Sequence, residues 1–529
     1  MKNSISEAGG KFMIVGGGIA GLACAVYLIR EGGAPGENIT IFDAADVSGG
    51  ALDGSGSAEE GYLIRGGRMH EEHFVCTWDL LSAIPSLDNP EISVKDEIFA
   101  FNREVVSGSH SRLLKGGEKM DVSSYGLSKH DIFDLLRLTM SSEKSIGGKS
   151  IEEWFSARFF DTVFWLIWST TFAFQRWSSV VEMRRYAVRF IHLLSGFNQL
   201  KGIMRTYYNQ YDSVVLPIET WLSARGVNFR LNTSVVDIDF EICETDKRAT
   251  ALHIISPEGE QKLSLAEDDC LFVTLGSMVE SAATGSMTSP APLVPKSQAG
   301  AWALWERVAV KDASFGRPQT FCNDPEKSKW MSFTVTLKDP TFFEYMENFT
   351  GNTAGTGGLV TITDSNWFMS VVLAHQPHFR NQPNDVFVCW GDGLLPDAPG
   401  NFVNKPMSMC SGEEILHELF SHLGILEMMQ PLMKEVSCVP CMMPYIDSQF
   451  MPRAIGDRPH VIPPGASNFA FVGQFVEVPN DCVFTVEYSV RTAQIAVFGL
   501  LGLEREVSLI YRGDHDINVL INALKALQR

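Results

Sequence analysis

The chain has 529 residues, of which 45% are hydrophobic and 20% charged, and its formal net charge is −20. These values are typical of a folded globular protein, and the length holds two to four domains' worth of core. The acidic balance argues against nucleic acid as a partner and against electrostatic binding to an anionic membrane.

A glycine-rich turn follows the first apolar run of the chain. Residues 12–15 lead directly into Gly16, Gly18 and Gly21, and residues 19–31 have the small and apolar side chains of a helix. In a strand–turn–helix unit the first glycine permits a tight turn, the second lets the backbone approach a pyrophosphate, and the third lets the helix pack on the strand. We therefore predict a dinucleotide site, with a βαβ unit that binds no ligand as the alternative.

A second strand is expected at residues 38–43, where it ends in Asp43. This acid follows Gly21 at about the 20-residue spacing of the carboxylate that binds the adenosine ribose. A further glycine pair includes Gly50, and two later strands, at residues 271–277 and 468–475, run into Gly276 and Gln474. A helix is expected at residues 483–501. Because the glycine-bearing segments continue far beyond the first unit, they favour FAD over NAD.

The segments predict an α/β chain with a discontinuous, Rossmann-like FAD-binding domain, an inserted β-rich substrate domain and a helical region. Short β-like runs at residues 330–337, 358–362, 367–374 and 386–390 indicate the inserted sheet. The predicted division is 1–125, 214–297 and 441–503 for the FAD-binding domain, 126–213 for the helical substrate-pocket region, 298–440 for the β-rich domain and 504–529 for a C-terminal helical tail.

The cysteines and the apolar segments indicate in which cellular compartment the protein is expected. Ten cysteines are scattered along the chain, and Cys438 and Cys441 form a lone C-x-x-C without a second pair for zinc. The longest strongly apolar stretch, residues 163–174, is too short to span a bilayer, and no secretory signal is visible. We expect a cytoplasmic protein with no metal site and no stable transmembrane association.

Residues 154–177 carry ten Phe and Trp side chains. Most aromatic residues in any protein belong to the core, but a cavity for a long apolar ligand would also use this density. Burying a fatty chain gains about 0.8 kcal/mol per methylene before entropy costs. The stretch therefore predicts either a large aromatic core or the lining of a lipid cavity.

Several long strings resemble the oleate hydratases, a family once called myosin-cross-reactive antigens. They include R-G-G-R at 65–68 with H-F at 73–74, T-F-A-F at 171–174, E-M-R-R-Y at 182–186, Y-N-Q-Y-D-S at 208–213, T-I-T-D-S-N-W at 361–367 and G-D-R-P at 456–459. The resemblance covers nearly the whole chain. It implies an FAD-binding hydratase that adds water to the cis-9 double bond of oleic acid, giving 10-hydroxystearic acid without net redox change.

The resemblance also assigns catalytic positions. A tyrosine that protonates the alkene corresponds to Tyr186. We expect Arg184, Arg185 and Arg189, together with the flavin, to supply a field that favours the phenolate. The glutamate that activates water corresponds to Met69, whose thioether cannot accept a proton. Glu71, Glu72 or His70 could replace it, or water could attack largely unaided; we favour Glu71 over Glu72.

The remaining positions implied by the resemblance bind substrate and cofactor. Gln210 and His378 correspond to groups that contact the fatty acid carboxylate, whereas Val372 and Ala374 stand where the family has hydrogen-bonding residues. The residues carried over for the flavin are Gly16, Gly18, Gly21, Asp43, Gly50, Arg65, Gly67, Gly276 and Gln474.

The short chain ends predict a monomer, because dimeric members of the family commonly have longer ends. Two other functions stay open at this point. One is a flavin-dependent oxidase, desaturase or isomerase acting on a lipid or an amine, and the other is a non-catalytic carrier of fatty acid or flavin. The expected partner under the hydratase hypothesis is an unsaturated free fatty acid.

Overall fold

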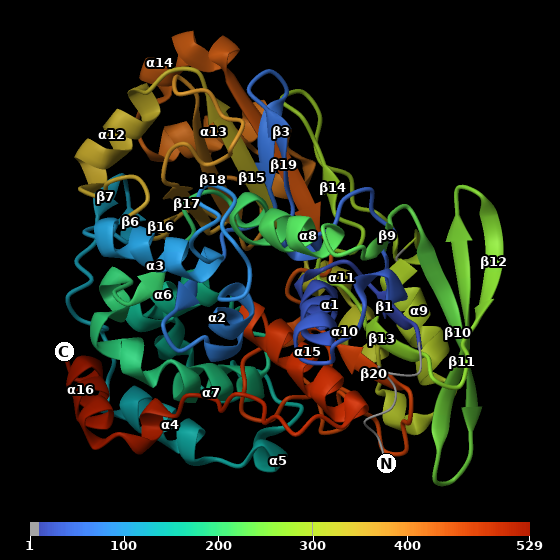
Figure 1. Ribbon diagram of the computed structural model, residues 1–529. Coiled ribbons are helices and arrows are strands. Elements are labelled where there is room, and N and C mark those ends of the chain that lie inside the picture. Colours follow the sequence, from blue (N-terminus) through green and yellow to red (C-terminus); the bar gives the residue numbers. More distant parts are fainter. Residues whose placement is uncertain (1–9, 299) are drawn as a thin grey trace.

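A five-stranded parallel sheet carries the glycine-rich turn in the computed structural model, which describes residues 10–298 and 300–529 (Figure 1). The first nine residues of the segment predicted at 1–125 lie outside the described residues. The strand order is β20 (Phe469–Val472), β13 (Cys270–Thr274), β1 (Phe12–Val15), β2 (Ile39–Phe42) and β9 (Asn228–Arg230). Three distant stretches of chain thus build one Rossmann-like α/β sheet, which confirms the predicted fold class.

Two helices pack against each other and against this sheet. They are α1 (Ile19–Arg30) and α15 (Val486–Leu501). The side chain of Thr485 caps α15 by accepting a hydrogen bond from the backbone N–H of Tyr488 at 3.1 Å. Gly502, with φ +61°, ends the helix in the left-handed conformation that glycine adopts readily. Both helices were predicted from sequence, and their existence is confirmed.

The second large sheet has eight strands and is mixed. Its order is β14 (Ala283–Thr284), β19 (Val436–Met443), β15 (Trp330–Leu337), β18 (Phe387–Gly393), β17 (Met369–Leu373), β16 (Val360–Ile362), β6 (Leu113–Lys115) and β7 (Glu118–Lys119). The four strands predicted between residues 330 and 390 are confirmed. Strands β6, β7 and β14 come from outside the segment 298–440. The sheet therefore also contains strands from earlier parts of the chain.

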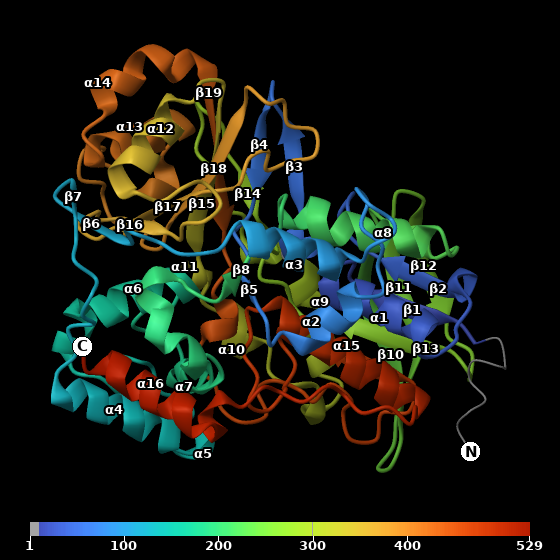
Figure 2. The same cartoon turned by 60° about the vertical axis from the view of Figure 1, so that its left-hand side comes forward.

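Strand β15 is buried along its whole length because both sheet faces are covered. On one face its apolar side chains belong to the same core as those of α12 (Thr341–Thr350) and α13 (Gly412–His422). On the other face Thr334 and Thr336 accept hydrogen bonds from the backbone of β4 (Gly61–Ile64), at 3.1 and 2.9 Å. The hairpin of β3 (Gly54–Ser57) and β4 lies beside the large sheet (Figure 2). The chain just before it contacts the glycine-rich turn, where the N–H of Gly49 donates to the carbonyl oxygen of Gly17 at 2.9 Å.

The helical region contains α4 (Lys129–Met140), α6 (Val163–Phe172) and α7 (Val180–Arg189), with the C-terminal α16 (Ile517–Leu527) beside α4 and α7 (Figure 2). Its aromatic side chains pack on one another: Trp168 lies 5.4 Å from Phe164 and 4.9 Å from Phe172 between ring centroids. None of residues 154–177 lines either of the two cavities described below. The rings therefore serve as core, the first of the two interpretations left open by the sequence.

A three-stranded antiparallel arm of β10 (Ser234–Ile242), β11 (Lys247–Ser256) and β12 (Gly259–Ser264) projects from the side of the Rossmann-like sheet (Figure 1).

Among residues 10–298 and 300–529, no helix combines the length and the apolar character needed to cross a bilayer. The remaining elements are β5 (His70–Glu71), α2 (Val75–Leu81), α3 (Val94–Glu104), α5 (Glu143–Ile146), β8 (Ile203–Met204), α8 (Leu216–Ser223), α9 (Gly300–Ala309), α10 (Gln319–Cys322), α11 (Pro325–Ser328) and α14 (Leu426–Met429).

Candidate functional site

The backbone of the glycine-rich turn explains why glycine is needed at Gly16 and Gly21 and what Gly18 leaves open. Gly16 has φ +100°, a conformation that side chains rarely adopt. A Cβ on Gly21 would lie 2.0 Å from the carbonyl oxygen of Gly16, so only glycine fits where α1 meets β1. A Cβ on Gly18 would meet nothing within 4 Å. The backbone is thus exposed at Gly18, where a phosphate can approach it closely.

Asp43 lies at the end of β2 and is fixed by backbone donors. Its Oδ2 accepts a hydrogen bond from the N–H of Gly17 at 2.6 Å, and its Oδ1 accepts one from Ala45 at 2.8 Å. Burial raises the pKa of Asp43, and the two backbone hydrogen bonds oppose that rise. The carboxylate is therefore held in one orientation beside the turn, as ribose recognition requires.

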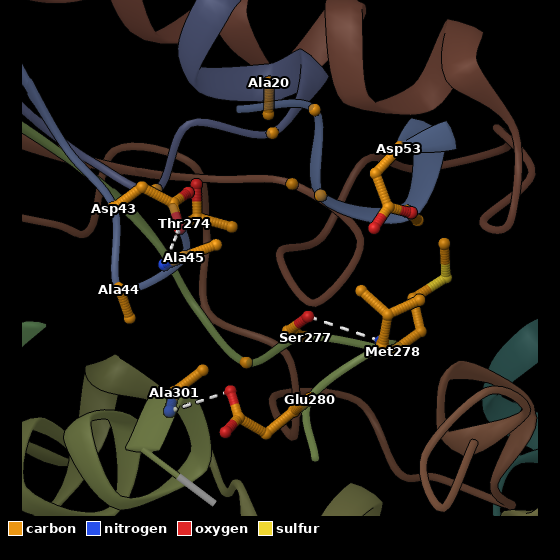
Figure 3. Close-up of a pocket in the computed structure, with 18 of the residues that line it drawn as sticks. Ala20, Asp43, Ala44, Ala45, Asp53, Thr274, Ser277, Met278, Glu280 and Ala301 are labelled. Carbon is orange, nitrogen blue, oxygen red and sulfur yellow. Dashed lines mark hydrogen bonds between the residues drawn. The ribbon is translucent and has the colours of Figure 1, made fainter. Parts of the chain in front are cut away.

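A cavity of about 930 Å³ extends from this turn (Figure 3). Figure 3 shows Asp43, Asp53 and Glu280 around it. The hydroxyl of Thr274 also lines it and is buried without a hydrogen-bond partner. Seven of the nine predicted cofactor residues line the cavity, namely Gly16, Gly18, Asp43, Gly50, Arg65, Gly276 and Gln474.

The other two predicted cofactor residues lie nearby. Gly21 lies beneath the turn, where its missing side chain allows the close contact with Gly16. Gly67 lines a second cavity of about 70 Å³, which shares Ala51, Leu52, Asp53 and Arg68 with the larger one. The two cavities are therefore neighbours across a common wall.

Both residues predicted to contact a carboxylate, Gln210 and His378, line the smaller cavity. The Nε2 of Gln210 donates to Thr206 Oγ1 at 3.2 Å, while its Oε1 is buried without a partner. Burial above all, with smaller contributions from the charges of His375 and Arg205, lowers the pKa of His378 to about 3. The imidazole of His378 is therefore neutral, and it can donate a hydrogen bond but carries no charge.

Tyr186 is buried in the aromatic core of α7 and lines neither cavity. Its hydroxyl donates to the carbonyl oxygen of Val483 at 2.7 Å. The next residue, Phe484, has φ +68° and forms part of the wall of the larger cavity. The phenol therefore lies behind that wall, separated from the cavity by the chain at Val483 and Phe484.

The arginine part of the expected field around Tyr186 is wrong for this structure. Burial raises the pKa of Tyr186 well above its ordinary value, and the charges of Cys482 and Glu182 add to the rise. The arginines do not oppose it, because acids neutralise them: Arg185 Nε lies 2.8 Å from Glu143, and Arg189 Nη1 lies 3.0 Å from Glu71. The surroundings favour the protonated phenol.

Of the residues at 69–72, only Glu71 is a buried carboxylate. Its Oε2 accepts from His73 Nδ1 at 2.9 Å and lies 3.4 Å from His192 Nε2. Burial raises the pKa of Glu71, but hydrogen bonds from His192 and His73 and the charge of Arg189 outweigh it, so the pKa lies below its ordinary value. Glu71 is thus ionised, firmly paired and a weak base.

The other predicted catalytic positions differ from Glu71. The side chain of Glu72 is 71% exposed, and neither it nor Met69 and Glu71 lines either cavity. The groups of Glu71, His73 and His192 lie close enough to hold a metal ion, although Arg189 already supplies a positive charge to the carboxylate. The structure thus does not bring the predicted water-activating residues to the cavity walls.

Three arginines on the cavity walls were missed from sequence, namely Arg68, Arg205 and Arg307, the last of which lines the larger cavity. Arg68 lines both cavities and donates to the carbonyl oxygen of Ala51 at 3.3 Å, and Arg205 lines the smaller one. Arg68 could have been predicted, because it belongs to the R-G-G-R string from which Arg65 and Gly67 were assigned. Arg205 stands in no motif, so no sequence signal marked it.

Comparison with known proteins identifies the family of this chain. A sequence profile described as the MCRA family matches residues 10–498. The chain belongs to the MCRA family. The MCRA chain is 41% identical over 522 residues to the oleate hydratase of Streptococcus pyogenes serotype M49 (strain NZ131), covering 96% of this chain and 88% of that protein. It is 31% identical over 562 residues to the linoleate hydratase of Lactiplantibacillus plantarum, with 98% of each chain covered.

Solved structures share the fold of this MCRA protein at low sequence identity. Cyclohexylamine oxidase from Brevibacterium oxydans IH-35A is 12% identical, with a TM-score of 0.53 over 93% of this chain and 98% of that chain. A redesigned triple mutant of putrescine oxidase is 11% identical, with a TM-score of 0.50 and the same coverage. These similarities concern the fold alone.

Proposed function

We propose that this protein adds water to the cis-9 double bond of unsaturated free fatty acids, converting oleic acid to 10-hydroxystearic acid with FAD in a non-redox role. The observation that carries the proposal is the common wall of the two cavities, where a cavity of dinucleotide type borders a small polar one. Membership of the MCRA family and the identity to an oleate hydratase support the same reaction.

The larger cavity fits FAD on three observations of the chain itself. The backbone at Gly18 is open to a pyrophosphate, Asp43 is oriented for ribose hydroxyls, and Thr274 offers a buried hydroxyl that has no partner. Arg65 and Gln474 would contact the group farther along the cavity. When bound, FAD would supply a rigid polar surface, and the net reaction would transfer no electrons to or from it.

The proposed reaction forms one C–H bond at C9 and one C–O bond at C10, and it breaks the alkene π bond and one O–H bond of water. No oxidant or reductant is consumed. Tyr186 is the proposed donor of the proton to C9, and its raised pKa keeps that proton in place while making the phenol a weak acid. The proposal requires the wall at Phe484 to open toward Tyr186 when substrate binds.

We propose Glu71 as the group that takes the proton from the attacking water, with Glu72 as the alternative. Met69 has no basic atom, and the neighbouring His70 is buried, with its pKa lowered to about 4 by burial. The proton that Glu71 takes up restores the phenol of Tyr186 at the end of the cycle, so the protein returns to its starting state.

The test is incubation of the purified protein with oleate and FAD under nitrogen, followed by mass spectrometry. A product heavier than oleate by one water supports the hydratase. Bleaching of the flavin by substrate, or oxygen uptake in air, would instead indicate an oxidase or related redox enzyme. Tight binding of oleate without any product would indicate a carrier.

Finer properties of the protein belong to the same proposal. We propose a cytoplasmic monomer, and the thiols of Cys438 and Cys441, buried on β19 without a disulfide, are consistent with a reducing compartment. The six-segment division of the chain given above stays our proposed domain organisation. Light scattering at micromolar concentration tests the monomer, and a stable dimer would contradict it.

A further inference from the structure

The smaller cavity has one cationic side chain whose charge no acid balances. Arg205 lines this cavity, its Nε is buried without a hydrogen-bond partner, and no ion pair joins it to any carboxylate of the described residues. Burial alone lowers the pKa of Arg205, to about 10, so the guanidinium remains charged near neutral pH. A buried cation without a counter-ion is costly, and such a group normally acquires an anionic partner.

The backbone that presents Arg205 is held on both sides by one residue. Asn102, near the end of α3, accepts a hydrogen bond from the N–H of Arg205 at 2.9 Å and donates one to its carbonyl oxygen at 2.7 Å. The same amide of Asn102 donates to Ile98 within α3 at 2.7 Å. The guanidinium is thus carried on a braced segment, which lowers the entropy lost when it binds an anion.

Neighbouring charges reinforce the positive character of this region. Arg112 is fully buried and donates only to neutral oxygens, those of Leu359, Phe197 and Thr171. Burial and, to a smaller extent, the charge of Arg205 lower the pKa of Arg112 to about 9. The acid on the cavity wall, Asp53, is already paired with Arg65 at 2.8 Å.

The polar groups beside Arg205 can orient an anion but cannot balance its charge. His378 is neutral, and Gln210 offers only an amide. Val372 and Ala374 line the same cavity without any side-chain donor. At about 70 Å³ the cavity suits a head group rather than an alkyl chain. The charge needed by an anionic head group must therefore come from an arginine.

Of the two arginines on this wall, Arg205 is the unmatched one. Arg68 donates to Ala51, lies over the ring of Phe484 at 5.2 Å and has Asp53 close enough to raise its pKa. Arg205 has none of these partners. We propose that the guanidinium of Arg205 is the counter-ion of the substrate carboxylate and makes the site select free fatty acids over neutral lipids of the same chain length. This inference rests on the proposed fatty acid substrate.

The experiment compares oleate with oleyl alcohol, which has the same chain and double bond but no charge. Binding of each to the full-length chain with FAD is measured by calorimetry below the micelle concentration. We expect Arg205→Met to weaken oleate binding about 10- to 100-fold, the effect of losing a charged hydrogen-bonded partner, and to leave oleyl alcohol binding within about twofold. Arg205→Lys should recover part of the oleate affinity.

Arg103→Met is the matched control, because Arg103 is exposed on the same helix as Asn102 and should leave both affinities unchanged. Equal weakening of both ligands by Arg205→Met would show a structural role and overturn the proposal, as would an unchanged oleate affinity. Turnover is measured separately. If the wild-type protein binds oleate through Arg205 but forms no hydroxy acid, the proposed hydratase function is refuted and the proposed role of Arg205 in carboxylate binding is supported.

Discussion

Replacing Tyr186 by phenylalanine removes one oxygen atom from a buried site and separates a catalytic role from a structural one. The hydroxyl donates to Val483 at 2.7 Å, and the side chain is 2% exposed. Losing one buried hydrogen bond costs about 1–2 kcal/mol of folding stability. Losing a general acid costs about 100- to 10,000-fold in rate, or about 3–5 kcal/mol of transition-state stabilisation. The rate effect should therefore exceed the effect on stability.

Tyr125 offers a matched control within the same aromatic core. Its hydroxyl donates to the carbonyl oxygen of Leu194 at 2.6 Å, the side chain is 4% exposed, and it lines neither cavity. We expect Tyr125→Phe and Tyr186→Phe to lose similar stability in urea unfolding. Only Tyr186→Phe should lose hydration of oleate, followed by mass spectrometry. If Tyr186→Phe keeps more than a third of the wild-type rate, or if Tyr125→Phe loses as much, the phenol is not the proton donor.

Three other outcomes follow from the geometry. Gly18→Ala should change the unfolding free energy of the flavin-free protein by no more than about 0.5 kcal/mol, but it should weaken FAD binding at least tenfold in a fluorescence titration. Gly21→Ala should instead destabilise the folded protein. Glu71→Gln should slow hydration at least tenfold and Glu72→Gln should not; the reverse result would transfer the role to Glu72. The unfolded chain protonates His70 near pH 6.5, but the folded chain does so only near pH 4. The free energy of unfolding should therefore fall by up to about 3 kcal/mol as the pH is lowered from 6.5 to 4. His70→Met should reduce that fall, and an unchanged acid titration of stability would contradict the burial argument.

The cofactor half of the site could be predicted because its parts are local. Gly16, Gly18, Gly21 and Asp43 lie within one βαβ unit, where spacing along the chain fixes spacing in the fold. The strand before the turn and the helix after it follow from the same short pattern. Of these four residues, Gly16, Gly18 and Asp43 line the larger cavity.

The smaller cavity could not be predicted as a site, because it is assembled from segments that lie far apart in the chain. Its wall combines Arg68 of the R-G-G-R string, Phe101 of α3, Arg205 beyond β8, and His375 in the loop after β17. A single arginine such as Arg205 has no periodic or motif signal. Only the fold shows that, within the described part of the chain, no carboxylate forms an ion pair with it.

The aromatic stretch at residues 154–177 shows another limit. Side chains that line a lipid cavity and side chains that fill a core have the same composition, so density alone does not distinguish them. Trp168, with 1% exposure and rings on several sides, is packed too closely to face either cavity. The distinction depends on how α6 and α7 are placed, which is a property of tertiary structure.

The distribution of charge differs most from what the sequence indicated. The sequence shows three arginines around Tyr186 but does not show that Glu143, Glu477 and Asp481 fold against them. These acids cancel the field at the phenol, so its proton stays bound. Positive charge that no acid cancels lies instead at Arg112 and at Arg205, and of these two Arg205 lines the smaller cavity. If the proposed reaction is correct, this protein uses its unpaired charge to hold the substrate carboxylate, and the position of the bound alkene rather than an acidic phenol must then govern proton transfer.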